Sequence, residues 1–167
     1  MYSSKFLKAF DYVMYHEGGY VEDPQDAGGE TCYGISKRSY PHLDIKNLTR
    51  DQARQIYFVD FWVKAKCEDI NDENIAIKFF DLCVNMGIPQ AVKLIQRALR
   101  ANRTRVLEDG IIGVITLQAI NKADPTDLLA ALKSESAGFY RLIAQANPSQ
   151  QKFIEGWLNR AYSSTII

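Results

Sequence analysis

The sequence predicts a mainly α-helical protein with one small β-like loop or hairpin near the N-terminus. Apolar residues recur at helical spacing through most of the 167 residues, and glycine or proline separates the runs. Residues 18–36 alone combine turn residues with short β-prone stretches. Because 47% of the residues are apolar and 24% are charged, the composition is that of a globular rather than a disordered protein.

The first helix is expected to end near Glu17. Gly18 and Gly19 follow it, and glycine readily takes the left-handed conformation found just after many helix ends. Residues 18–36 then form the loop or small hairpin. The apolar positions of this helix share one face at spacing i, i+4, i+7: Phe6, Phe10 and Val13.

The later apolar runs predict further helices that are bounded by capping or breaking residues. Thr49 and Gln52 fit a capping box that opens a helix. Gly87 and Pro89 are expected to close a strongly apolar helix, and Pro125 to break the chain. The helical patterns cover about residues 49–57, 75–86, 91–98, 116–123, 128–143 and 153–161.

Charge and cysteine content exclude several classes of protein. The 20 basic and 20 acidic residues balance, whereas a nucleic-acid binder usually carries a large positive excess. Residues 1–88 nevertheless have a net charge of −4 and residues 89–123 one of +4. The cysteines form no CxxC pair, and their odd number argues against a disulfide framework, so we expect reduced, buried thiols: Cys32, Cys67 and Cys83.

The N-terminus has no apolar core or cleavage site of a signal peptide, and no apolar run approaches the 18 residues of a membrane span. We therefore expect a chain that is made in the cytoplasm and does not insert into a membrane. No cluster has metal-ligand spacing, so no metal site is expected.

Candidate catalytic residues lie in and just after the end of the first helix. A carboxyl of Glu17 held against an apolar face, at a helix C-terminus, has its ionised form disfavoured, which suits a general acid. Asp26, in a glycine-flanked loop, is expected to stay ionised, and the Thr31 hydroxyl could orient a water. Two carboxylates in contrasting surroundings are what glycoside hydrolysis requires. The alternative is that these residues only end a helix and form turns.

This stretch resembles the signature of glycoside hydrolase family 108, whose members are also described as secretion-activating proteins and occur among phage endolysins. The shared pattern is E-G-G-Y followed by D-x-G-G-x-T-x-x-G-I-[TS], at residues 17–20, 26–31 and 34–36. Tyr57 with residues 61–62 resembles an aromatic Y…YW segment, with Phe in place of the second Tyr. Residues 81–87 and 109–116 resemble D-x-x-V-N-x-G and D-G-x-x-G-x-x-T, the latter from an associated peptidoglycan-binding segment.

The resemblance implies a lysozyme-like N-acetylmuramidase that cuts the β-1,4 bond between N-acetylmuramic acid and N-acetylglucosamine without a cofactor. Residues 1–88 would be the catalytic segment and residues 89–167 a peptidoglycan-binding helical segment, packed together into one compact domain. The partner would be the peptidoglycan glycan strand, with no nucleic acid. The implied setting is a bacterial or phage-derived protein made without a signal peptide, exported through a holin, acting in the periplasm and cell wall as a monomer.

Roles for individual residues follow from a second resemblance, to phage-type lysozymes. These place a Glu at a helix end, an Asp nine residues on and a Thr shortly after. Glu17 would be the general acid, Asp26 the general base or electrostatic partner, and Thr31 the residue that positions water. Asp23 or Glu30 could replace Asp26 in that role.

Four residues are candidates for substrate binding: Tyr20, Tyr33, Trp62 and Asn85. The aromatic rings could stack on sugar faces, with core packing as the alternative for Trp62, and Asn85 could bond an N-acetyl group or cap its helix. His16 is expected to be a hydrogen-bonded residue at the helix end rather than a base, and Cys32 lacks the histidine partner of a nucleophile.

Two rival functions remain at this stage. The chain could bind peptidoglycan without cutting it, or assist the secretion of other proteins. Within the enzyme class, a lytic transglycosylase is the alternative to a hydrolase. Arg97, Arg100 and Arg103 recur every three residues and are expected to share a helix face, either solvated or attracted to an anionic wall polymer.

Overall fold

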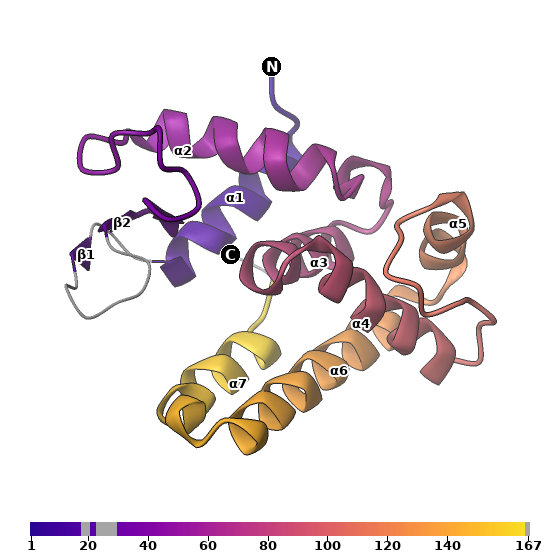
Figure 1. Cartoon of the computed structure of the whole chain (residues 1–167). Helices are drawn as coiled ribbons and strands as arrows, with labels where there is room; N and C mark the ends of the chain where they lie inside the picture. The colour runs from indigo at the N-terminus through magenta and orange to yellow at the C-terminus, as the bar shows by residue number, and fades with distance from the viewer. Residues whose placement is uncertain (18–20, 23–29, 166–167) are drawn as a thin grey trace.

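The computed structural model describes residues 1–17, 21–22 and 30–165 and confirms a mainly helical fold with a small antiparallel sheet (Figure 1). The strands are β1 (Val21–Glu22), β2 (Glu30–Cys32) and β3 (Ile35–Ser36). The α-helices are α1 (Ser4–Glu17), α2 (Arg50–Tyr57), α3 (Glu73–Met86), α4 (Ile88–Ala101), α5 (Val114–Lys122), α6 (Pro125–Ala146) and α7 (Ile154–Tyr162). Short turns of other helix types are a π-helical turn (Phe58–Val63) and two 3₁₀ turns (Cys67–Asp69, Pro148–Phe153).

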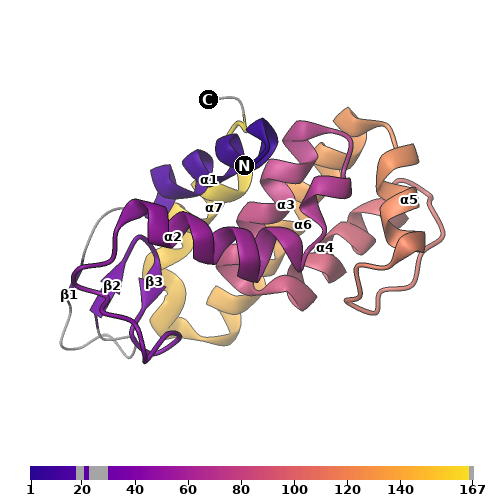
Figure 2. The same ribbon diagram turned by 90° about the horizontal axis from the view of Figure 1, so that it is seen from above.

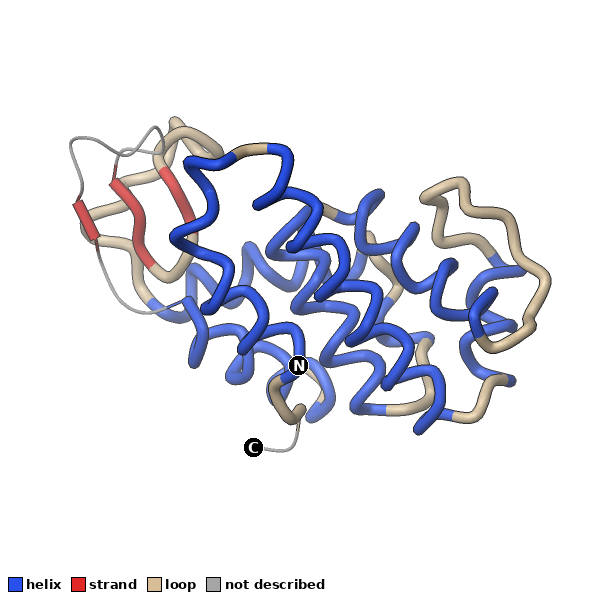
Figure 3. The backbone as a smooth tube through the Cα atoms, turned by 90° about the horizontal axis from the view of Figure 1, so that it is seen from below, coloured by secondary structure: helices blue, strands red, loops and turns tan. Residues whose placement is uncertain are grey.

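The sheet lies at one end of the molecule and α5 at the other, with α3 in the middle (Figures 2 and 3). A run of α3 side chains, from Ile75 to Cys83, is buried throughout. This helix packs against α1 on one side and against α4 and α6 on the other. One apolar core therefore joins elements from both halves of the chain.

Helix α1 forms because its apolar residues share one face, as the sequence pattern predicts. Phe6, Phe10 and Val13 are fully buried on that face, which packs against α3. The C-terminal end of the chain returns to this helix, since the Tyr12 hydroxyl hydrogen-bonds Ser163. The last residue of α1, Glu17, is thereby anchored by the core at a fixed place.

The sheet has the order β1-β2-β3, with antiparallel pairing throughout. A two-residue turn joins β2 to β3, because Cys32 pairs with Ile35. Both turn residues have positive φ, 51° at Tyr33 and 75° at Gly34, as a type I′ hairpin turn requires. Glycine suits the second position because it takes positive φ without steric cost.

The predicted capping box of α2 is confirmed. The Thr49 side chain accepts a hydrogen bond from the Gln52 amide, and the Gln52 side chain accepts one from the Thr49 amide. These bonds satisfy amides that a helix start leaves without partners. Helix α2 then continues into the π-helical turn, which the sequence analysis did not predict.

Two prolines begin helices, whereas the sequence analysis expected them to end or break the chain. Helix α3 ends at Met86, Gly87 follows with φ of 85°, and α4 starts at once with Pro89 in its first turn. Pro125 likewise opens α6 behind the Asp124 cap. The first turn of a helix has amides without intrahelical partners, so the missing N–H of proline costs nothing there.

The three cysteines are free and buried, as expected. Burial raises the pKa of each thiol, which opposes a nucleophilic role for Cys32. In the described residues, no helix is both long and apolar enough to cross a membrane.

Candidate active site

Glu17 is the residue around which the candidate site is built. It ends α1, and its side chain is 20% exposed. The core holds the helix, and the carboxylate reaches out between the β2–β3 turn and α7. Both oxygens have close neighbours, one from each side.

The β2–β3 turn lies directly against one oxygen. A Cβ added at Gly34 would lie 2.7 Å from Glu17 Oε2 and 2.7 Å from the Tyr57 hydroxyl. Position 34 therefore requires glycine for two reasons: its φ is positive, and a side chain would collide with Glu17 and Tyr57. The Tyr57 hydroxyl donates to the Tyr33 carbonyl at 2.9 Å, so the turn is fixed to the end of α2.

The other oxygen is bound by a buried arginine from the last helix. Arg160 Nη2 donates to Glu17 Oε1 at 2.8 Å, and Arg160 Nε donates to Asp81 Oδ1 at 2.9 Å. Lys78 Nζ donates to Asp81 Oδ2 at 3.3 Å and to the Arg160 carbonyl at 2.6 Å. We call Glu17, Asp81, Arg160 and Lys78 the four-charge network.

The network contains two acidic and two basic side chains, and most of it is buried away from solvent. Asp81 and Lys78 have side chains that are 0% exposed, and that of Arg160 is 12% exposed. Burial opposes the charged form of Arg160, but Asp81 and Glu17 more than offset it and raise its pKa. Burial lowers the pKa of Lys78, and Asp81 opposes that shift. The sequence analysis expected an apolar wall beside Glu17 and missed this arginine.

Two uncharged rings complete the surroundings of Glu17. Burial, and then the charge of Glu17, raise the pKa of Tyr57, so its hydroxyl stays protonated as a donor. Burial also lowers the pKa of His16, and its Nε2 is buried without a hydrogen-bond partner among the described residues. The predicted hydrogen bond of His16 is therefore absent at that atom, and a neutral imidazole beside Glu17 is favoured.

A pocket of about 410 Å³ opens beside Gly34 and Tyr57, next to Glu17. Its walls come from the sheet, the loop after β3, the end of α2 with the π-helical turn, and α3. The lining residues are Gly34, Ile35, Ser36, Ser39, Tyr40, Tyr57, Asp60, Phe61, Lys64 and Val84. Hydroxyls, one ion pair and three aromatic rings are the mixture that suits a carbohydrate, which has both polar edges and apolar faces.

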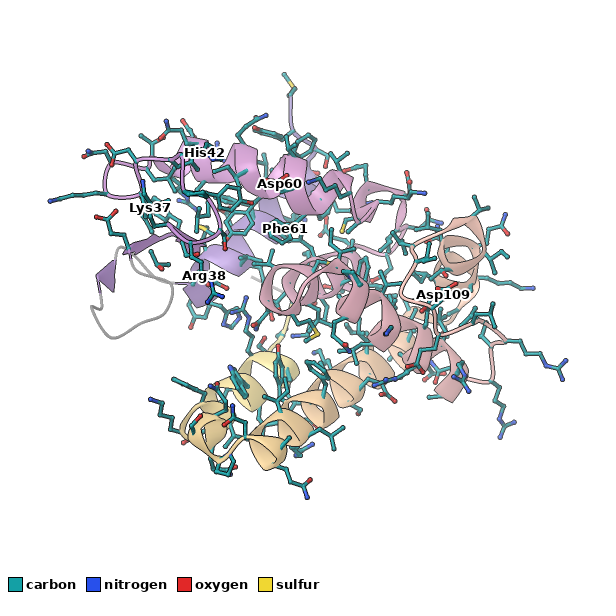
Figure 4. The ribbon with its side chains drawn as sticks, in the orientation of Figure 1. Lys37, Arg38, His42, Asp60, Phe61 and Asp109 are labelled. Carbon is teal, nitrogen blue, oxygen red and sulfur yellow. The ribbon has the colours of Figure 1, made fainter. Side chains whose placement is uncertain are left out.

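Asp60 organises the polar side of this pocket. It accepts hydrogen bonds from the Tyr40 hydroxyl at 2.9 Å and from Lys64 at 2.7 Å. The bond from Lys64 is the main reason that the pKa of Asp60 is lowered. Asp60 and Phe61 lie on the turn after α2 (Figure 4), so this turn presents an anion and a ring side by side.

Trp62 does not line the pocket, and its predicted role in stacking on sugar is corrected. Its side chain is 1% exposed and packs against Phe6 and Phe80, and its indole N–H donates to Glu68 at 2.9 Å. Trp62 and Phe61 are neighbours in the π-helical turn but point in different directions. Trp62 lies in the core, whereas Phe61 lines the pocket beside Tyr57.

The other predicted site residues have different outcomes. Thr31 lies in the middle strand, paired with Val21 and Ser36. Tyr33 contributes its carbonyl to Tyr57, and its ring packs partly against the core. Asn85 lies near Tyr140, where its side chain opposes the rise that burial causes in the pKa of that tyrosine. Asp26 and Tyr20, with the rival Asp23, lie outside the described residues.

The three regularly spaced arginines do not share a helix face. Arg97 and Arg100 lie on α4 and bind Glu108, at 2.7 Å and 3.4 Å. Arg103 lies beyond the end of α4 and has a φ of 62°. In the described parts of the chain, no group of three or more His, Cys, Asp or Glu side chains could hold a metal ion.

Comparison with known proteins matches the chain to two family models in succession. Residues 10–87 match the glycosyl hydrolase 108 model, and residues 90–162 match the model described as a predicted peptidoglycan domain. The chain therefore carries a glycosyl hydrolase 108 domain followed by a predicted peptidoglycan domain. The first match contains Glu17, the β2–β3 turn and the pocket, whereas Arg160 lies in the second.

A solved structure has the same fold over nearly its whole length. The structure of Brucella abortus SagA is similar with a TM-score of 0.72 and 25% identity, over 97% of this chain and 96% of that one. No curated protein matches the chain significantly. The two matched domains support a glycoside hydrolase with a peptidoglycan-related role.

Proposed function

We propose that this chain is an N-acetylmuramidase that hydrolyses the β-1,4 bond between N-acetylmuramic acid and N-acetylglucosamine, with Glu17 as the general acid. The observation that carries the proposal is the place of the Glu17 carboxylate. Glu17 is the last residue of a helix that packs on the core, and its two carboxyl oxygens contact Arg160 and the turn at Gly34. The carboxyl also adjoins a pocket whose lining suits a carbohydrate. A positioned carboxyl beside a glycan pocket is the arrangement that protonates a leaving glycosidic oxygen.

The network around Glu17 supports a role beyond structure. Arg160 orients one oxygen of the carboxyl, and the turn at Gly34 orients the other. A carboxyl held at both oxygens has little rotational freedom, so its proton would be delivered along a defined direction. Burial of the network also strengthens each of these interactions, because the surroundings are poor in water.

A second carboxylate is needed to activate water or to stabilise the positive charge that develops on the sugar ring. We propose Asp26 for this role, with Asp23 or Glu30 as the alternatives. Thr31, on the middle strand, is proposed to position the attacking water. The neutral His16 adds no cation beside Glu17.

The pocket beside Glu17 is the proposed binding site for the sugar. A sugar in the pocket would meet the Phe61 and Tyr57 rings and the Ser36 and Ser39 hydroxyls. Phe61 takes the stacking role that the sequence analysis gave to Trp62. Peptidoglycan is the substrate that accords with the second matched segment, residues 90–162.

The remaining expectations belong to the same proposal. The chain would act in the cell wall as a monomeric, endolysin-type enzyme that reaches its substrate through a holin. Its catalytic segment would span residues 1–88 and its peptidoglycan-binding segment residues 89–167. Co-expression with and without a phage holin tests this export route.

One observation favours a second function, binding without cleavage. The Arg160 guanidinium lies 2.8 Å from Glu17 Oε1, so one oxygen of the candidate acid is already held by a partner within the protein. Such an arrangement would also exist in a wall-binding protein that holds a glycan strand and never cuts it. The two functions differ in whether wild-type protein clears walls at all.

Turbidity clearing of purified cell walls, together with wall pull-down, tests the proposal. Glu17→Gln should abolish clearing while pull-down stays within about twofold, since the amide keeps the size of the carboxyl and loses its proton. Glu155→Gln, at an exposed position on α7, is the matched control and should clear walls normally. Absence of clearing by the wild type on walls of several chemistries, with pull-down intact, would favour the binding function.

A further inference from the structure

The loop between α4 and α5 lies at the end of the molecule farthest from the sheet (Figures 1 and 2), and several of its large aliphatic side chains are exposed. Monomeric proteins rarely expose several such side chains together unless the surface binds something. We call the surface formed by residues 103–115 the distal surface. Its exposed apolar side chains are Leu107 at 79%, Ile111 at 66%, Val114 at 66% and Ile115 at 74%.

Hydrogen bonds hold the backbone of this surface in one conformation. The Gln96 side chain, buried in α4, donates to Asp109 at 2.8 Å and to Thr116 at 3.2 Å, and accepts from the Gly110 amide at 3.0 Å. Asp109 lies between α4 and α5 (Figure 4). The aliphatic side chains therefore project from a braced loop, and their exposure is not the result of a loose chain.

Exposure alternates along the first part of the loop. Arg103, Arg105 and Leu107 are exposed, whereas the residues between them are partly buried. Over residues 104–108 this is the period of an extended chain, so Arg105 and Leu107 project on the same side. Arg103, with a φ of 62°, precedes this stretch in the turn after α4.

Residues 103–115 hold two arginines and two carboxylates, and with Arg97 and Arg100 of α4 beside them the surface has a net charge of +2. Glu108 is already bound by Arg97 and Arg100. Arg103 and Arg105 have no carboxylate within ion-pair distance in the described part of the chain. A shallow hollow of about 670 Å³ brings the charges and the apolar side chains together, lined by Arg100, Arg103, Arg105, Leu107 and Ile115 among others.

We propose that the distal surface docks on an anionic phospholipid bilayer. Arg103 and Arg105 would lie at the level of the lipid phosphates, and Leu107 and Ile115 would enter the headgroup region. Free cations beside aliphatic side chains are the combination that binds such a surface, where each basic residue and each buried apolar group adds to affinity. The protein lies on the bilayer in this arrangement and does not cross it.

Charge complementarity selects this occupant over the others. An uncharged glycan would be bound by aromatic rings and hydroxyls, and the exposed large side chains of this surface are aliphatic. A protein partner would leave the two free arginines to be paired by its own carboxylates, whereas anionic lipid supplies phosphates at any position. The candidate pocket shares no lining residue with this hollow, so docking leaves it open.

Vesicle sedimentation with the full chain tests the proposal. Vesicles of phosphatidylglycerol and phosphatidylcholine should bind the wild type, and vesicles of phosphatidylcholine alone should bind it at least about tenfold more weakly. Binding should fall as salt is raised, because the phosphate contacts are screened. Equal binding to both kinds of vesicle, or binding to neither, would overturn the proposal.

Paired variants separate the two contributions. Arg103→Gln with Arg105→Gln should weaken binding by about fivefold per arginine, and Leu107→Ser with Ile115→Ser by at least about tenfold. Arg141→Gln with Leu142→Ser changes an exposed arginine and an exposed leucine on α6 and should leave binding unchanged. Unchanged melting temperatures would show that each variant is folded, and wild-type binding by both distal pairs would contradict the proposal. The proposal does not depend on Glu17, so Glu17→Gln should bind vesicles like the wild type.

Discussion

Glu17 Oε1 and Arg160 Nη2 lie 2.8 Å apart although 143 residues separate them in the sequence. The first residue lies in the segment that matches the glycosyl hydrolase 108 model, and the second in the segment that matches a predicted peptidoglycan domain. Arg160 also binds the buried Asp81, so one guanidinium joins α1, α3 and α7. The candidate acid therefore depends on a helix from the other end of the chain.

Arg160→Gln should destabilise the protein by about 3 kcal/mol, because breaking a buried ion pair leaves a charge without its partner. Asp81 keeps Lys78 but loses its second cation. Urea unfolding measures the change. Arg141→Gln, on the surface of α6, is the control and should shift the free energy of unfolding by less than about 0.5 kcal/mol. A variant at position 160 as stable as the control would mean that the network does not stabilise the fold.

Gly34→Ala should lower wall-clearing activity at least about tenfold and cost about 1–3 kcal/mol of stability. The added Cβ would lie 2.7 Å from Glu17 Oε2, and φ is 75° at this position. Clearing rates and thermal melting of the purified variant provide the measurements. Gly138→Ala, inside α6 where a Cβ meets nothing within 4 Å, is the matched control and should clear walls normally with no loss of stability. Normal clearing by Gly34→Ala would contradict the close approach of the turn to Glu17.

Phe61→Ala and Trp62→Ala should affect different properties, the first substrate binding and the second stability. Loss of the Phe61 ring should raise KM for soluble glycan fragments by about tenfold, as expected for lost stacking. Loss of the buried Trp62 side chain should instead cost about 3–5 kcal/mol of stability. Steady-state kinetics and urea unfolding of both variants separate these effects. If Trp62→Ala raised KM and stayed fully stable, the assignment of Trp62 to the core would be wrong.

Stability should fall as pH rises above about 10, the ordinary pKa of tyrosine. Burial raises the pKa of Tyr12 to about 12, and burial also raises the pKa of Tyr40, Tyr57 and Tyr140. Above pH 10 the unfolded chain releases these protons while the folded chain retains them, so unfolding is increasingly favoured. The three buried thiols act in the same direction as the tyrosines, because burial raises their pKa values too. Lys78 has the opposite sign, since its lowered pKa makes stability rise with pH below its unfolded value, but it is one group against seven.

Urea unfolding at a series of alkaline pH values measures this dependence. Tyr12→Phe should lose stability less steeply with pH than the wild type, because one of the four tyrosines no longer titrates. Tyr162→Phe, at an exposed position, is the control and should keep the slope of the wild type. A wild-type free energy of unfolding that stays flat from pH 9 to 11 would contradict the burial of these hydroxyls.

Much of the fold follows from local sequence patterns. The spacing of Phe6, Phe10 and Val13 predicts α1 and its end at Glu17, and the Thr49–Gln52 capping box marks the start of α2. Such signals need no knowledge of the tertiary structure. The π-helical turn after Tyr57 leaves no comparable signal, so the sequence alone does not show that Phe61 rather than Trp62 lines the pocket.

The candidate site was predicted in part. Glu17 could be chosen because helix end, glycines and family signature all lie within a short stretch of sequence. Arg160 could not, because nothing local distinguishes it from the other arginines of the chain. Its role depends on α7 returning to α1, which is a property of the tertiary fold.

Mass spectrometry of a wall digest carried out in isotopically labelled water tests the central claim most directly. A hydrolase with Glu17 as its acid should release fragments ending in N-acetylmuramic acid that carry one labelled oxygen at the reducing end. Glu17→Gln should release none above background. Label-free anhydromuramyl ends would identify a lytic transglycosylase instead, and labelled fragments released at the wild-type rate by Glu17→Gln would contradict the account.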